Sequence, residues 1–71
     1  MSNTELDTIY KFIVRYMEEH DGLSPSLREI ADGCHYHHST VDRYLLMLEM
    51  QGRVKRDAHR ARSIRLVKSS D

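Results

Sequence analysis

The sequence is poor in the residues that break or cross-link a chain. Its 71 residues include three glycines, one proline and a single cysteine, Cys34. So little glycine and proline, beside 39% hydrophobic and 31% charged residues, excludes a disordered or collagen-like chain. One cysteine cannot form an internal disulfide, so a reducing compartment is expected. These absences are typical of a small folded domain.

Long apolar runs are missing as well. No stretch approaches the roughly 18 apolar residues of a membrane-spanning helix, and no basic-then-apolar leader opens the chain. We therefore expect a cytoplasmic protein without a membrane partner. A chain of 71 residues accommodates one small core, so residues 1–71 are expected to form a single domain, with no separate catalytic domain.

The formal net charge of the whole chain is zero, but basic and acidic residues are unevenly distributed along it. Eleven basic and eleven acidic residues give a formal charge of zero. Residues 1–51 carry four basic and nine acidic side chains, whereas residues 52–71 carry seven basic and two acidic ones. A polyanion responds to the local potential rather than to the total charge. The last quarter of the chain therefore predicts a basic face suited to nucleic acid.

Helical periodicity dominates the first half of the chain. Apolar residues recur every three or four positions over residues 6–20, which predicts a scaffold helix over about residues 4–21. Ser26 stands three residues before Glu29, as in a capping box, and this pair opens a second, short helix over about residues 27–34.

A third helix is predicted over about residues 39–51, opened by a capping box of Ser39 and Asp42 and followed by Gly52. Its buried stripe should be Val41, Leu45 and Leu48. A polar, aromatic turn, HYHH, separates it from the second helix. Two short helices around such a turn are typical of a helix-turn-helix, whose second helix enters a DNA groove.

The remaining residues change period. Partial alternation over residues 53–57 and 62–67, with four residues between them, predicts a wing hairpin over about residues 53–67 that packs on the helices. Residues 68–71 are expected to be a frayed tail. The fold class is thus mainly α with a small β-hairpin, a three-helix winged helix-turn-helix.

Several motifs follow one another in the order of a known family. The chain contains GLSPSLREIADGC, then STVDRYLLMLEMQGRVKRD, then RSIRLV. It resembles the N-terminal DNA-binding domain of the LexA repressors, in which P-S-x-R-E-I precedes S-T-V, an L-E-x-x-G helix end and a basic wing. The resemblance covers residues 6–67 and implies a bacterial or phage repressor that binds double-stranded DNA at an operator, often an inverted repeat. The self-cleaving Ser-Lys peptidase domain of that family does not fit within 71 residues, so no enzyme activity is expected.

By this resemblance, the base-reading residues are Ser39, Thr40, Asp42 and Arg43. The planar fork of Arg43 matches guanine O6 and N7, although a phosphate contact or a solvated charge would also explain it. Asp42 could accept a hydrogen bond from cytosine N4, but its place in a capping box is a sufficient reason for it.

Phosphate contacts are expected from the start of the second helix, the turn and the wing. His37 and His38 would touch phosphate when protonated, which would tighten binding below about pH 6.5. Some of the arginines could instead only keep the hairpin edge soluble. The expected residues are Ser26, Arg28, His37, His38, Arg53, Lys55, Arg56, Arg60 and Arg62.

Two other functions compete with DNA binding. Cys34, His35, His37 and His38 are potential metal ligands, but C-H-x-H-H is too cramped for one tetrahedral centre, so neither a metal nor another cofactor is expected. A protein-docking module is the second alternative, because Leu46, Met47 and Met50 lie outside the inward stripe. No dimer surface is visible, so we expect a monomer or a weak, DNA-dependent homodimer.

Overall fold

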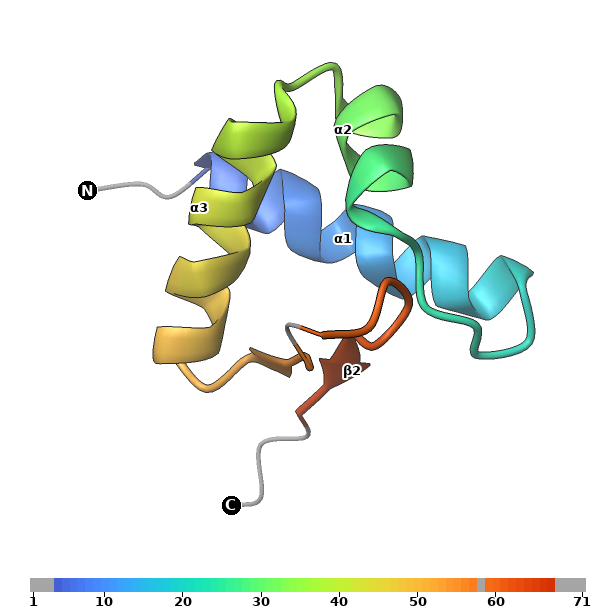
Figure 1. Ribbon diagram of the computed structural model, residues 1–71. Helices are drawn as coiled ribbons and strands as arrows, with labels where there is room; N and C mark the ends of the chain where they lie inside the picture. The colour runs from blue at the N-terminus through green and yellow to red at the C-terminus, as the bar shows by residue number, and fades with distance from the viewer. Residues whose placement is uncertain (1–3, 58, 68–71) are drawn as a thin grey trace.

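The computed structural model describes residues 4–57 and 59–67, and it has the predicted architecture. Three helices, α1 (Thr4–Glu19), α2 (Leu27–Cys34) and α3 (His38–Met50), precede strands β1 (Val54–Lys55) and β2 (Arg65–Leu66). The strands pair antiparallel beside the C-terminal end of α3 (Figure 1). The mainly helical winged helix-turn-helix fold class is confirmed.

One core joins all three helices to the hairpin. The stripe predicted for α3 is buried throughout, whereas the stripe predicted for α1 is buried at Leu6, Ile9 and Ile13 and becomes half-buried and then exposed toward its end at His20. The side chains of Ile9, Ile13 and Leu45 are fully enclosed. Val54 and Ile64 extend the core into the hairpin, so the strands are anchored by burial as well as by hydrogen bonds. The buried apolar residues are Leu6, Ile9, Ile13, Ile30, Ala31, Val41, Leu45, Leu48, Val54 and Ile64.

The first helix ends two residues earlier than predicted. Asp21 and Gly22 adopt left-handed backbone angles, with φ of 55° and 86°, and such angles cannot continue a helix. The Gly22 N–H donates to the Met17 carbonyl at 2.7 Å and closes the helix end. The chain then turns toward α2.

The capping box at the start of α2 is confirmed. The Glu29 N–H donates to Ser26 Oγ at 3.1 Å, and the Ser26 N–H donates to Glu29 Oε1 at 2.8 Å. Both bonds satisfy backbone donors that a helix start leaves without partners. The helix ends at His35, which takes a left-handed φ of 62° and opens the turn to α3.

The capping box predicted for α3 is wrong. The helix begins at His38, one residue before the predicted start, and its N-cap residue His37 makes no side-chain capping bond. Ser39 and Asp42 therefore lie within the helix. The Asp42 carboxylate instead accepts a hydrogen bond from Arg56, a tertiary contact that capping statistics do not contain.

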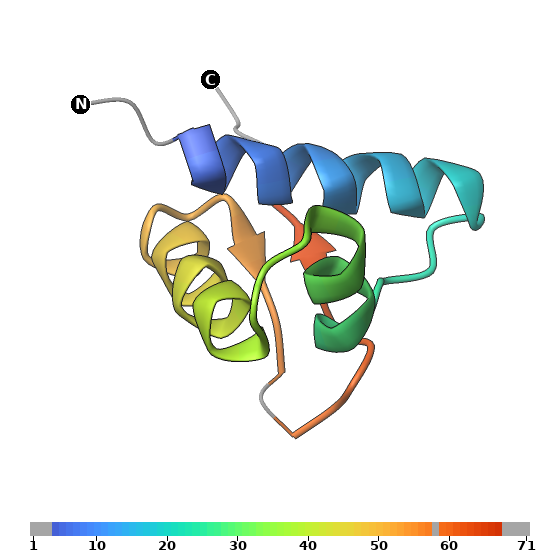
Figure 2. The ribbon, with the colours of Figure 1, turned by 90° about the horizontal axis from the view of Figure 1, so that it is seen from above.

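The hairpin is shorter than predicted, and its loop is longer. Val54 pairs with Leu66 and Lys55 with Arg65, so nine residues, 56–64, connect the strands where four were predicted. Ser63 Oγ closes this loop by accepting from the Asp57 N–H at 2.9 Å. From above, the loop extends away from α1 on the side of α2 and α3 (Figure 2). The predicted tail over residues 68–71 lies outside the described residues.

Two helices approach closely at Gly33. A Cβ at this position would lie 2.2 Å from Cε2 of Phe12, far inside van der Waals contact. The absence of a side chain therefore lets α2 lie against the aromatic ring on α1. This contact helps to set the angle at which the helix-turn-helix leaves the scaffold helix.

Candidate nucleic-acid interface

The first turns of α3 form the polar end of the helix-turn-helix. Val41, Leu45 and Leu48 point into the core, which turns the opposite side of α3 to solvent (Figures 1 and 2). Three of the four predicted base-reading residues, Ser39, Asp42 and Arg43, are exposed there, and Thr40 is half-buried. The structure thus brings all four onto the first two turns of one helix.

Arg43 carries a positive charge on this surface that no carboxylate of the described residues neutralises. Its side chain makes neither an ion pair nor a hydrogen bond with any residue that the structure describes. Asp42, one position earlier, is held by Arg56 instead. A free guanidinium on an exposed helix face keeps all five of its donors available to a ligand.

A three-residue ion cluster ties the wing to α3. Arg56 donates through Nη2 to Asp42 Oδ1 at 2.9 Å and through Nε to Glu49 Oε2 at 2.8 Å. Burial opposes the charge of Arg56, but the hydrogen bonds to the two carboxylates outweigh it and raise the pKa of the guanidinium. The positive charge of Arg56 therefore interacts with carboxylates on two different turns of α3.

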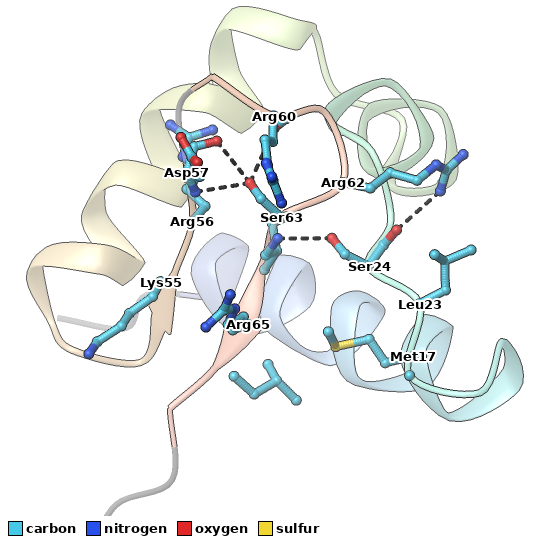
Figure 3. Close-up of a pocket in the computed structure, with 13 residues that line it drawn as sticks. Met17, Leu23, Ser24, Lys55, Arg56, Asp57, Arg60, Arg62, Ser63 and Arg65 are labelled. Atoms are coloured by element: carbon cyan, nitrogen blue, oxygen red, sulfur yellow. Dashed lines mark hydrogen bonds between the residues drawn. The ribbon is translucent and has the colours of Figure 1, made fainter.

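A second cluster ties the far side of the loop to α2. Arg62 forms a fork on Glu29, with Nη1 to Oε1 at 2.7 Å and Nη2 to Oε2 at 2.9 Å. It also donates to the Ser24 carbonyl at 3.1 Å, as Figure 3 shows. The hydrogen bonds from Arg62 and from the Ser26 backbone lower the pKa of Glu29 to about 2. The buried Ser24 hydroxyl accepts from the Ile64 N–H at 3.0 Å and reinforces the same junction.

A third arginine contacts the scaffold helix. Arg53 Nη1 lies 3.3 Å from Asp7 Oδ1, and its guanidinium carbon stands 4.4 Å above the centre of the Tyr10 ring. Arg53, Arg56 and Arg62, which were all expected to contact phosphate, thus have partners within the protein. Sequence alone does not reveal these partners, because each arginine meets carboxylates of a different helix, far from it along the chain.

The other expected phosphate contacts are more open. The side chains of Arg28, Lys55 and Arg60 are exposed and make no ion pair among the described residues. His37 and His38 are exposed at the start of α3, whereas the Ser26 hydroxyl caps α2.

The sequence prediction overlooks one further cation. Arg65 is exposed and lies directly opposite Lys55 in the hairpin register, which places two positive side chains side by side. Like charges facing each other across strands destabilise a ribbon unless an anion lies between them. The alternation of Arg65 with the half-buried Leu66 was the signal that could have found it.

A depression of about 640 Å³ separates the hairpin from the end of α1 (Figure 3). Met17, Leu23 and Leu66 supply apolar walls, and Lys55 and Arg65 lie at its hairpin side. It borders the wing rather than the exposed face of α3.

Comparison with known proteins identifies the domain type. The model of the IclR helix-turn-helix domain matches residues 13–58, well over half of the chain. The chain belongs to the IclR helix-turn-helix domain family. The matched segment includes α2, the turn, α3 and the first strand, which are the elements that carry the site.

The relatives of this helix-turn-helix domain are repressors. It is 39% identical to the LexA repressor of Finegoldia magna over 62 residues, covering 86% of this chain and 29% of that protein. The same identity extends over 70 residues of the LexA repressor of Clostridium kluyveri, covering 97% and 34%. In Koribacter versatilis the LexA repressor is also 39% identical, over 61 residues, covering 84% and 29%. The resemblance inferred from the motifs is confirmed.

The chain spans about a third of the length of these curated relatives. The family match and the repressor relatives together support DNA-binding transcription regulation, and they point to a regulator rather than to an enzyme. Each helix in residues 4–57 and 59–67 is too short or too polar to cross a membrane.

The CHYHH segment of this IclR-type domain does not converge on one point. Among the described residues, no three His, Cys, Asp or Glu side chains lie close enough to hold a metal ion. Cys34 packs against the core, and burial raises the pKa of its thiol. The half-buried Tyr36 packs edge-on against Tyr44 with ring centres 6.1 Å apart, so the turn is held mainly by aromatic contact.

Three of the large exposed apolar residues lie on α3, as the sequence suggested, and Leu23 is exposed before α2. Leu46 is 53% exposed, Met47 is 40% exposed and Met50 is 79% exposed. They follow Ser39 and Arg43 along the outer side of the helix at spacings of three and four residues. The outer side of α3 is therefore polar near its start and apolar near its end.

Proposed function

We propose that this chain is the sequence-specific, double-stranded DNA-binding domain of a transcriptional repressor. The observation that carries the proposal is the free guanidinium of Arg43 on the exposed side of α3, the second helix of a helix-turn-helix. Helices in this position enter the major groove and contact base edges with their N-terminal residues. Ser39, Thr40, Asp42 and Arg43 occupy those turns.

Arg43 has the most specific task in this proposal. A guanidinium can donate two hydrogen bonds to guanine O6 and N7, a pairing that discriminates against other bases by about 1–3 kcal/mol. Ser39 and Thr40 offer hydroxyl groups to a base or a phosphate, and Thr40 also offers a methyl group. Asp42 is the acceptor of the set, suited to the amino group of cytosine.

The phosphate-contacting residues fall into three groups in this proposal. Ser26 lies at the start of α2, where a helix N-terminus favours an anion. Arg53, Arg56 and Arg62 are paired with carboxylates and hold the wing in place. Each of them would contact phosphate only by dividing its guanidinium donors between that carboxylate and the phosphate. The residues free to bind phosphate directly are Arg28, His37, His38, Lys55, Arg60 and Arg65.

Selection of bound sites from random duplexes tests the proposal. Wild-type protein is expected to enrich a common site, and Arg43→Ala is expected to lose preference at a guanine and to bind about tenfold to a hundredfold more weakly. Arg15→Ala is the matched control, because Arg15 is an exposed arginine on the scaffold helix that pairs with no carboxylate in the described part of the chain. The control should select the wild-type site with unchanged affinity.

The opposite outcome is equally clear. If wild-type protein enriches no site and Arg43→Ala binds duplexes as wild type does, DNA readout is excluded. A docking function then becomes the better explanation, since Leu46, Met47 and Met50 expose apolar side chains on α3. In that case a substitution such as Met50→Lys should abolish partner binding.

The operator and the assembly follow from the same proposal. Helix-turn-helix modules commonly bind inverted repeats as dimers, one half-site per helical turn or multiple of it. We infer that this domain is monomeric or weakly associated alone and pairs on such an operator. Sedimentation of the free domain and of the domain on one or two half-sites distinguishes the two states.

A further inference from the structure

The recognition helix carries an acidic group where DNA would approach. Asp42 lies beside Arg43 on the exposed side of α3, and its side chain is 59% exposed. A bare carboxylate at this place would repel the phosphates that flank a major groove. An explanation for Asp42 therefore has to include what compensates its charge.

Arg56 supplies that compensation from outside the helix. It follows β1, and its side chain is 20% exposed, so most of that side chain is covered by the protein. Asp42 and Glu49 lie seven residues apart, about two turns along one face of α3, and Arg56 lies between them. One positive charge thus opposes two negative charges that share the face nearest the wing.

The hydrogen bonds of Arg56 occupy only one of the two carboxylate oxygens of Asp42. Arg56 Nη2 takes Oδ1 of Asp42 at 2.9 Å, while Oδ2 of Asp42 has no hydrogen-bond partner among residues 4–57 and 59–67. A carboxylate gripped at one oxygen has a restricted orientation, and its second oxygen can accept from a ligand. Glu49, with a side chain only 28% exposed, is less open to such a ligand.

We propose that Arg56 is a positioning residue for DNA readout: it neutralises and orients Asp42 so that Oδ2 accepts a hydrogen bond from a base amino group, that of cytosine or adenine. This inference rests on the proposed function. It assigns Arg56 an effect that acts through Asp42, in place of the direct phosphate contact that its charge and its place in the wing suggest.

Three variants measured on the selected site separate the two roles. Arg56→Met keeps the stem, removes the charge and is expected to weaken binding about tenfold, because a carboxylate then faces DNA without its partner. Adding Asp42→Asn removes that repulsion, so the double variant should bind within about threefold of Asp42→Asn alone. The salt dependence of binding should be the same in Arg56→Met as in wild type.

Lys55→Met is the matched control. Lys55 precedes Arg56, is exposed and makes no ion pair among the described residues. Its loss should reduce the log–log salt slope by about 0.9 in magnitude, as for one phosphate contact. Asp42→Asn should not rescue Lys55→Met, because the two side chains share no contact.

The contrary result is a loss of affinity in Arg56→Met that persists in the Asp42→Asn background and flattens the salt slope by about 0.9. That result would show Arg56 touching phosphate and would overturn the inference, while the enriched site would leave the proposed function standing. Wild-type protein that enriches no site would overturn both.

Folding is monitored for each variant by thermal unfolding. Should Arg56→Met not fold, Asp42→Asn alone still decides the matter, because Arg56 keeps Glu49 as its partner in that variant. Asp42→Asn should lose about tenfold discrimination at one base pair of the selected site. Unchanged preference at every position would overturn the inference.

Discussion

Each arginine of this chain is defined by whether a carboxylate of the same chain lies within reach. Arg53, Arg56 and Arg62 are paired at 3.3 Å or less, whereas Arg43 has no carboxylate partner within residues 4–57 and 59–67. Exposed ion pairs contribute little to stability individually, so the main effect of pairing is to fix where the charge lies. The side chain of Arg43 on α3 can therefore change its orientation when a ligand binds, whereas the paired arginines keep their charges at fixed positions.

The serines also differ in whether their hydroxyl group has a partner in the fold, and single substitutions test this difference. Ser26→Ala removes the acceptor that caps α2 and should lower the free energy of unfolding by about 1 kcal/mol. Urea denaturation at neutral pH measures the change.

Ser39→Ala is the internal control for that measurement. Ser39 lies inside α3, although the sequence predicted it as a cap, so its removal should change stability by less than about 0.5 kcal/mol. A loss at Ser39 as large as that at Ser26 would contradict the observed start of α3.

At the scale of elements, Glu29 is the joint between the helix-turn-helix and the wing. One oxygen of its carboxylate accepts from the Ser26 backbone, and both accept from Arg62 of the loop. The group that caps α2 therefore also holds the loop over residues 56–64. Loss of this carboxylate would loosen two elements at once.

The charge of Glu29 makes this joint sensitive to acid. Its pKa in the folded protein is about 2, below its ordinary value of 4.5, so its stabilising contribution is present above pH 4.5 and is lost as pH falls toward 2. Glu29→Gln should therefore be less stable than wild type at neutral pH, and the two stabilities should converge as pH falls through this range. Thermal unfolding from pH 7 to pH 2 follows the effect.

Glu18→Gln provides the comparison for this titration. Glu18 is exposed on α1, and its side chain has no hydrogen bond to the rest of the described chain. Thermal unfolding of Glu18→Gln over the same pH range measures the effect of removing an exposed carboxylate that does not contact Arg62. A parallel response in both variants would show that the acid sensitivity does not come from the Arg62 contact.

The elements differ in how far sequence predicts them. The helices follow from local signals, such as the apolar spacing of Ile9 and Ile13 and the pair Ser26 and Glu29. The hairpin length does not, because its loop is set by long-range contacts, such as Ile64 to Ser24 across 40 positions. Periodicity along one segment contains no information about such partners.

The candidate site, too, could be predicted from the sequence only in part. The outward face of α3 was predictable, because the inward stripe of that helix fixes which residues face outward. The partners of its charges were not, since Asp42 meets Arg56 across 14 positions and Glu29 meets Arg62 across 33. The contacts expected with DNA remain predictions.

At the scale of the whole molecule, most basic residues belong to the last quarter of the chain, which contains the wing. The helix α1 lies along one side of the molecule, and the loop of the wing extends away from it (Figure 2). Affinity that comes from phosphate contacts weakens with salt in proportion to their number. With Arg28, Lys55, Arg60 and Arg65 as the contacts at pH 8, the log–log slope should be about −3.6 per monomer. Fluorescence anisotropy on the selected duplex at several salt concentrations measures it.

A slope of about −5 or steeper would indicate additional contacts. The paired arginines would then have to leave their carboxylates when DNA binds. A slope near zero would rule out the phosphate contacts altogether.

Gly33 has a consequence for how this domain can vary. The residue is exposed, so by accessibility alone its position would be expected to accept most substitutions. The ring of Phe12 occupies the space that any other side chain would begin in, which ties the identity of residue 33 to that of residue 12. Among natural variants of the domain, a larger residue at position 33 should therefore appear together with a smaller one at position 12, whereas the adjacent Asp32 is free to drift.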